Sequence, residues 1–315
     1  MGQPQGLHSA SEMSSYAEAT HLLKKHKWSE AILAFRSILS TEPDSVRCRV
    51  GLGKALTHSG KREEALNGMI QLVAHLKGAQ KNLLIRRIHV FSRVCLSNKT
   101  FQIYQEGVNF LLAQKYRMAQ EKFEKALSEE SGNVEILTRL GQSLILSGDF
   151  TGAVNRLVSA KKLNPFEPEV RLWLGKALVQ GGRPLEGLQE FQSAYQEMPE
   201  SEQAAVWLAE ALAGSGQGNS ALKVLSNDTK KWPFHVTSLF TLAKLRIQQG
   251  HLDSQSLGLV RKDLKMALDR LEHSPQDERS PEKIEISLDL RRPLPELKEE
   301  IQKLLNQAYR KYPER

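Results

Sequence analysis

A pair of apolar positions recurs along this chain at an almost constant interval. At six places a small residue stands four residues before a larger apolar one. The small residues are Ala31, Ala65, Ala119, Ala153, Gly187 and Ala221, and their larger companions are Phe35, Met69, Phe123, Leu157, Phe191 and Leu225. Successive small residues are 34 positions apart, except for one step of 54 between Ala65 and Ala119. Such a period predicts an array of one stacked structural unit rather than separate globular cores.

Each period contains two helical patterns. In the unit that begins at Val134, Leu137, Leu140 and Gly141 share one helix face, and the glycine is expected to let a neighbouring helix approach closely. Gln142, beside it, is expected to be exposed. The first helix of a unit is predicted to end at a glycine with left-handed backbone, and the second to end before a proline. These glycines are Gly60, Gly148, Gly182 and Gly216, and the prolines are Pro43, Pro165, Pro199 and Pro233.

The register of small, aromatic, glycine and proline positions over residues 12–235 resembles the tetratricopeptide repeat (TPR) family. The resemblance implies an all-α, right-handed superhelical solenoid of about six to seven helix-turn-helix repeats, whose members mostly bind other proteins. Units are expected to begin at Glu12, Val46, Thr100, Val134, Pro168 and Glu202. A decayed seventh unit follows from Val236, with Gln255 where the small residue should stand.

The 20 extra residues of the long step lie between Leu76 and Thr100. They are too apolar for a surface loop and long enough for four helical turns. We therefore expect an inserted helix at about residues 80–97. It is expected either to pack simply against the array or to mark a bend or an interface.

The ends of the chain differ in composition from the array. Residues 1–11 are predicted to be disordered, residues 12–273 to form the solenoid, and the polar residues 274–283 to form a linker. Residues 284–315 are predicted to hold an extended segment and a helix over Leu297–Ala308. The extended segment alternates apolar with polar positions and is expected to dock on its own solenoid, as a permanent cap or as a displaceable mimic of a partner. Its apolar residues are Ile284, Ile286, Leu288 and Leu290.

No group of residues suggests catalysis. The nine histidines form no metal-ligand spacing, and no phosphate-binding glycine loop is present, so neither an enzyme nor a cofactor or metal site is expected. Cys48 and Cys95 stand far apart without a CxxC partner, which favours free thiols, and we expect a cytoplasmic protein without a membrane span. The net charge of +8 is distributed along the chain without interleaved aromatic residues, which argues against nucleic acid as a partner.

In the proteins that this chain resembles, the first helix of each unit lines a concave groove. The equivalent positions here combine an apolar middle with flanking lysines and suit an apolar stretch of peptide. The predicted groove residues are Lys54, Tyr104, Val108, Leu111, Thr138, Gln142, Ile145, Leu172 and Lys176. The alternative is that several of these side chains pack against the neighbouring second helix.

The sequence therefore predicts a non-catalytic adaptor that holds a protein or peptide in this groove and is regulated by its own C-terminal segment. The alternative is a structural oligomer that associates through the inserted or the C-terminal helix. The chain is accordingly expected to be a monomer or a homodimer.

Overall fold

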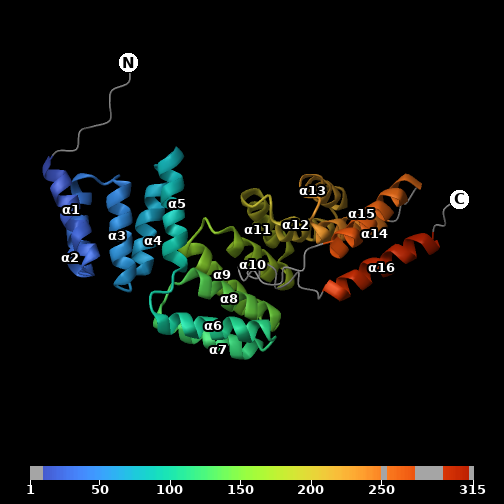
Figure 1. Cartoon of the computed structure of the whole chain (residues 1–315), viewed down its shortest axis with the longest axis horizontal. Helices are drawn as coiled ribbons and strands as arrows, with labels where there is room; N and C mark the ends of the chain where they lie inside the picture. Colours follow the sequence, from blue (N-terminus) through green and yellow to red (C-terminus); the bar gives the residue numbers. More distant parts are fainter. Residues whose placement is uncertain (1–9, 250–253, 274–293, 312–315) are drawn as a thin grey trace, which may run out of the picture. The chain divides into compact units, whose positions relative to one another are not determined.

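The computed structural model describes residues 10–249, 254–273 and 294–311. All the regular structure in these ranges is helical, and sixteen helices follow one another along the chain (Figure 1). The chain divides into two units, Met1–Trp173 and Leu174–Arg315, and helix α10 (Pro168–Gln180) crosses from one into the other. Each helix within the described ranges is too short or too polar to cross a membrane.

The first unit consists of helices that pack consecutively in pairs, with one additional helix, α5, after the second pair. They are α1 (Ala10–Lys24), α2 (Trp28–Thr41), α3 (Val46–His58), α4 (Arg62–Val73), α5 (Gly78–Arg93), α6 (Asn98–Leu112), α7 (Tyr116–Glu129), α8 (Val134–Leu146) and α9 (Phe150–Leu163). The second unit continues with α11 (Pro184–Glu197), α12 (Glu202–Gly214), α13 (Gly218–Lys231), α14 (Val236–Gln248), α15 (Ser254–His273) and α16 (Leu294–Lys311).

Left-handed backbone ends the first helix of most repeats. Gly60, Gly148, Gly182 and Gly216 have φ angles of +76°, +87°, +81° and +80°, as their spacing predicts. The first and third repeats reach the same conformation without glycine, at His26 (φ +57°) and Gln114 (φ +58°). Non-glycine residues adopt this region at a cost. The turn geometry is therefore imposed by the helices that it joins.

The close approach expected at Gly141 is present. A Cβ atom built there would lie 2.6 Å from Cγ of Leu157, which belongs to the second helix of the same repeat. Gly107 faces Phe123, and Gly175 faces Phe191, in the same relation. The exposure expected for Gln142 is wrong, because its side chain is fully buried. Its Oε1 accepts a hydrogen bond from Nη1 of Arg139 at 3.1 Å, so a buried polar partner replaces water.

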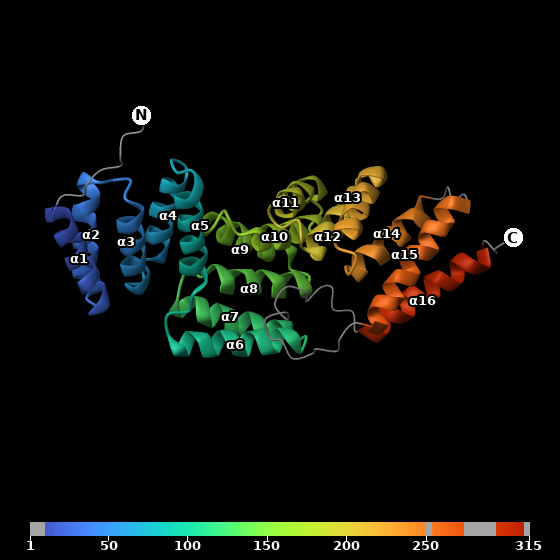
Figure 2. The same cartoon turned by 45° about the horizontal axis from the view of Figure 1, so that its top comes forward.

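Helix α5 occupies the extra residues and joins two parts of the first unit. Figures 1 and 2 show it beside α4, and it also packs against α3 and α8. Leu84, Ile88 and Phe91 project from one face into a core with Met69 of α4 and Leu137 of α8. Helix α5 thus contributes to one continuous core that extends from α3 to α9.

In the second unit the last described helix packs on the helix before it. Helix α16 contacts α15 and buries an apolar stripe at Leu297, Ile301, Leu305 and Ala308. The guanidinium of Arg261 lies 4.3 Å from the ring centroid of Tyr309, which adds a cation–π contact to this interface. The predicted linker and the predicted docking segment, including Ile284, Ile286, Leu288 and Leu290, lie outside the described residues.

Candidate functional site

The residues predicted for the groove differ widely in burial. Lys54 is exposed, and Tyr104, Val108 and Lys176 are partly buried. Lys176 belongs to the second unit, whereas the others belong to the first. Five of the nine have at most 5% of their surface exposed: Leu111, Thr138, Gln142, Ile145 and Leu172. These five side chains therefore contribute mainly to packing in the structure.

Tyr104 takes part in a polar network inside the first unit. Its hydroxyl donates a hydrogen bond to Oε1 of Glu135 at 3.0 Å, and Nε of Arg139 donates to the same oxygen at 2.8 Å. Burial and the nearby Glu135 charge both raise the pKa of Tyr104 above its usual range. The ring also lies 6.0 Å from that of Phe123. Tyr104 thus combines core packing with a buried hydrogen bond.

The inserted helix adds a second arginine to this network. The guanidinium of Arg93 forms an ion pair with Glu135 and lies 3.5 Å from Glu167 and 3.6 Å from Glu169. Burial alone would raise the pKa of Glu135, but the charges of Arg139 and Arg93 outweigh it and hold that pKa below its usual value. Burial also dominates at Glu169, whose pKa rises to about 7.

This charged cluster positions helices. Its members come from α5, from α8 and from the chain around the start of α10, so their attraction connects segments that are distant in sequence. Among the residues that the structure describes, no group of His, Cys, Asp and Glu could hold a metal ion. Sequence reasoning missed Arg93 because its acidic partners are more than 40 positions away and follow no local motif.

A second polar junction fixes the segment that follows α5. Both carboxylate oxygens of Glu130 accept a hydrogen bond from the backbone N–H of Leu96, at 2.8 and 3.0 Å. The same carboxylate pairs at 3.0 Å with Arg62, of whose side chain only 3% is exposed. Arg62 also donates to the carbonyl oxygen of Val94 at 2.6 Å. The entry into α6 is therefore held by buried, charge-assisted hydrogen bonds.

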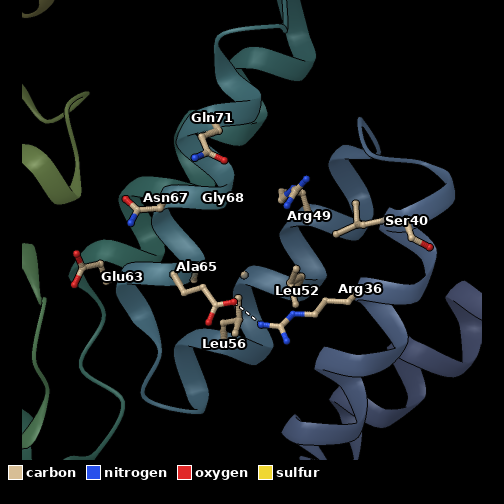
Figure 3. Close-up of a pocket in the computed structure, with 13 residues that line it drawn as sticks. Arg36, Ser40, Arg49, Leu52, Leu56, Glu63, Ala65, Asn67, Gly68 and Gln71 are labelled. Carbon is tan, nitrogen blue, oxygen red and sulfur yellow. Dashed lines mark hydrogen bonds and ion pairs between the residues drawn. The ribbon is translucent and has the colours of Figure 1, made fainter.

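A cleft of about 760 Å³ lies between α2, α3 and α4 in the first unit (Figure 3). Leu52 and Leu56 of α3 line it, and Arg36 crosses it to form an ion pair with Glu64 of α4. Nη2 of Arg49 donates to the carbonyl of Pro43 at 3.2 Å. Lys54 does not line this cleft, which is consequently separate from the predicted groove.

A smaller pocket of about 350 Å³ lies in the second unit, between α10, α11 and α12. The ammonium of Lys176 lies 4.7 Å from the ring centroid of Trp207, a cation–π distance. Phe191 and Val179 add apolar surface, and Glu210 adds an acidic group. This pocket thus contains a residue predicted for the groove and combines apolar walls with both signs of charge.

Comparisons with known proteins agree with the repeat spacing. Tetratricopeptide repeat models match residues 16–74, 110–177 and 178–233, which together make up more than half of the chain. No significant match exists among curated proteins. The solved structures of similar fold include a thermophilic TPR protein in Thermus thermophilus. It is 17% identical, with a TM-score of 0.50 over 66% of this chain and 99% of its own.

Two further solved structures are similar over nearly the whole chain. Yeast Tom70 is 14% identical, with a TM-score of 0.49 over 98% of this chain and 66% of its own. A tetratricopeptide repeat protein from Parabacteroides merdae ATCC 43184 is 15% identical, with a TM-score of 0.44 over 95% of this chain and 99% of its own. At such identities structural likeness concerns the fold alone. The family models and the 34-residue period identify the chain as a member of the tetratricopeptide repeat superfamily.

Proposed function

We propose that this chain is a non-catalytic adaptor that binds a segment of a partner protein at the pocket of its second unit. The TPR fold is generally an interaction scaffold, and a scaffold needs an accessible receptacle. The observation that carries the proposal is the pocket of about 350 Å³ around Lys176 and Trp207. Its volume is at the lower end for ligand sites and suits one or two side chains of a peptide.

The chemistry of the pocket defines the segment that it would hold. Trp207 and Phe191 offer aromatic surface to an apolar side chain. Lys176 and Glu210 stand at the same pocket and offer partners to a carbonyl oxygen and to an N–H group. A short peptide with one apolar anchor and free backbone polar groups fits this combination. Among the predicted groove residues of the first unit, Lys54 is exposed, and Tyr104 and Val108 are partly buried.

The alternative of self-association through the C-terminal helix is less well supported. The apolar stripe of α16 at Ile301 and Leu305 is buried against its own chain, so it is not available to a second copy. The expected cytoplasmic location, the absence of a nucleic-acid partner and regulation by residues 284–290 remain parts of the proposal.

The test has two stages. A photo-crosslinking amino acid at Ala211, which lines the pocket, is used in cells to identify the bound segment. A synthetic peptide of that segment is then titrated calorimetrically against the purified chain. We expect Lys176→Glu to weaken binding at least about tenfold, since it changes the sign of a charge in the pocket. The melting temperature should fall only slightly, through the lost cation–π contact with Trp207.

Lys223→Glu serves as the matched control, because Lys223 is exposed on α13 of the same unit and does not line the pocket. It makes the same change in net charge. If Lys223→Glu weakens binding as much as Lys176→Glu does, binding depends only on net charge and the proposal is wrong. Equal binding by Lys176→Glu and the unmodified chain would also refute it.

A further inference from the structure

The inserted helix α5 has three distinct faces. One face places Leu84, Ile88 and Phe91 in the core. A second face carries the polar contacts of His89 and Arg93 to the acidic cluster. An ordinary surface helix has one apolar stripe that packs on the core, and its other faces are polar and exposed to water. The third face of α5 differs, because it is exposed and yet apolar.

That third face is an exposed apolar stripe. Leu83 and Val90 are 44% and 51% exposed and lie seven residues apart, and Val94, directly after the helix, is 38% exposed. Exposed apolar residues that occur singly are normal on a protein surface. Leu33 on α2 and Leu185 on α11 are of this kind, because each is the only exposed large apolar residue of its helix. Leu83 and Val90 instead share one face of α5, two turns apart, and form one stripe, and the exposed Val94 follows directly after the helix.

The charge that α5 itself carries beside this stripe has a single sign. Arg86 and Arg87 lie between Leu83 and Val90 and are exposed. Helix α5 contains no aspartate or glutamate. Neither Arg86 nor Arg87 pairs with an acidic residue of the described ranges. Each arginine can also lay its aliphatic stem along the stripe while its guanidinium stays in water.

We propose that this stripe of Leu83 and Val90, together with Arg86, Arg87 and Val94, is a docking surface for an acidic amphipathic helix of a partner protein. The apolar residues take the partner's apolar face as in helix–helix packing. The two arginines pair with glutamates or aspartates that flank that face, as charged positions beside a coiled-coil seam do. The stripe lies in the first unit and is a binding surface in addition to the pocket proposed above.

The basic character of α5 favours this partner over another copy of a basic helix. Bringing two such helices together would oppose Arg86 and Arg87 to their own equivalents, which costs binding energy. Charge also sets the expected dependence on salt. Exposed pairs are screened within a Debye length of about 8 Å at physiological ionic strength, so affinity should fall as salt is added.

Two synthetic helical peptides test the proposal on the full chain. Both carry leucine at i, i+4, i+7 and i+11; glutamates flank the leucines in the acidic peptide, and lysines replace them in the basic one. Binding is measured by fluorescence anisotropy. We expect the acidic peptide to bind and the basic peptide not to bind. Reversing the charge of both arginines, Arg86→Glu with Arg87→Glu, should lower the affinity for the acidic peptide about tenfold or more. Each exposed ion pair contributes up to about a factor of five to that affinity.

The apolar part is tested by Leu83→Gln with Val90→Gln, which keeps helix propensity high. This variant should lose binding of the acidic peptide, whereas Leu33→Gln with Leu185→Gln, a matched change at exposed leucines elsewhere, should retain it. Circular dichroism checks that all variants melt as the unmodified chain does. A variant that melts early is replaced by Leu83→Gln alone.

Four outcomes would overturn the proposal. The first is that the acidic peptide does not bind, and the second is that the basic peptide binds equally well. The third is that the arginine reversal leaves the affinity for the acidic peptide unchanged. The fourth is that the chain itself forms a dimer that Leu83→Gln with Val90→Gln dissociates, because the stripe then serves a second copy. Binding to two other probes is measured in parallel: vesicles that contain phosphatidylserine, and separately a duplex RNA. If the chain binds either probe but not the acidic peptide, the result counts as the first outcome.

Discussion

Replacing Gly141 by alanine isolates the energetic consequence of close helix approach. A Cβ at this position of α8 would lie 2.6 Å from Cγ of Leu157, well inside contact distance. Gly68, in the interior of α4 in the same unit, is the natural control. There a Cβ would come no closer than 3.5 Å, from Nη1 of Arg49, which is ordinary contact. The two substitutions are chemically identical and differ only in the space available.

The expected magnitude follows from two opposing contributions. Glycine to alanine in a helix interior gains about 1 kcal/mol in intrinsic propensity, and both variants receive this gain. Overpacking against Leu157 costs about 1–3 kcal/mol. The free energy of unfolding of Gly141→Ala should therefore be lower than that of Gly68→Ala by about 1–3 kcal/mol. For a unit of this size the melting temperatures should differ by roughly 2–12 °C.

Urea unfolding followed by circular dichroism measures this difference. Adding Leu157→Ala to Gly141→Ala should recover part of the loss, because the new methyl group would occupy space that the leucine vacates. Leu157→Ala alone should cost about 2–5 kcal/mol, so the double variant should be more stable than the sum of the single effects requires. If Gly141→Ala stabilises the protein as much as Gly68→Ala does, the inferred packing register is wrong.

Three further changes test other parts of the structure. Glu169→Gln should remove a pH dependence of stability. The pKa of Glu169 is about 7 in the folded chain against an ordinary 4.5, so the folded state keeps a proton that the unfolded state has lost. The free energy of unfolding of the unmodified chain should therefore fall by roughly 3 kcal/mol as the pH rises from 4.5 to 7. Urea titrations at pH 5 and pH 7.5 should show this fall in the unmodified chain and a smaller one in the variant. Ile301→Asp places a charge at a fully buried site of α16 and should destabilise the second unit by at least about 3 kcal/mol, as measured by thermal melting. Lys303→Asp, at an exposed site of the same helix, is the control and should not destabilise it to this extent. Glu130→Gln leaves the guanidinium of Arg62 buried without its counter-charge and should lower the free energy of unfolding by about 3–5 kcal/mol. The backbone N–H of Leu96 should then exchange its hydrogen faster, because it loses a charged acceptor. An unchanged exchange rate at Leu96 would contradict the proposed junction.

The repeat spacing was sufficient to predict most of the fold. A fixed interval between small and large residues can be read along the chain, because each contact such as Gly141 with Leu157 occurs within one repeat. The extra apolar residues likewise predicted a helix after α4. The left-handed turns at His26 and Gln114 could not be predicted, because those residue types do not by themselves prefer this backbone conformation.

The candidate site was less accessible from sequence for a physical reason. The family pattern indicates which positions of a repeat face the groove, but it does not indicate whether other side chains bury them. Ile145 and Leu172 are nearly fully buried, although their positions predicted a surface for a peptide. The inserted helix brought Arg93 to Glu135, a contact for which the repeat pattern has no counterpart. Sites built by an irregular element therefore had to be found in the structure.

The core shared by α3, α5 and α9 also has a consequence for how the first unit unfolds. In a regular repeat array each repeat contacts only its neighbours, so the ends can fray one repeat at a time. Here Met69, Ile88 and Leu163 belong to one apolar cluster although they are far apart in sequence. Losing the repeat that contains α9 would expose the inner face of α5. The part of the first unit from α3 to α9 should therefore unfold as a single cooperative block, and it could not be lengthened or shortened at α5 by whole repeats.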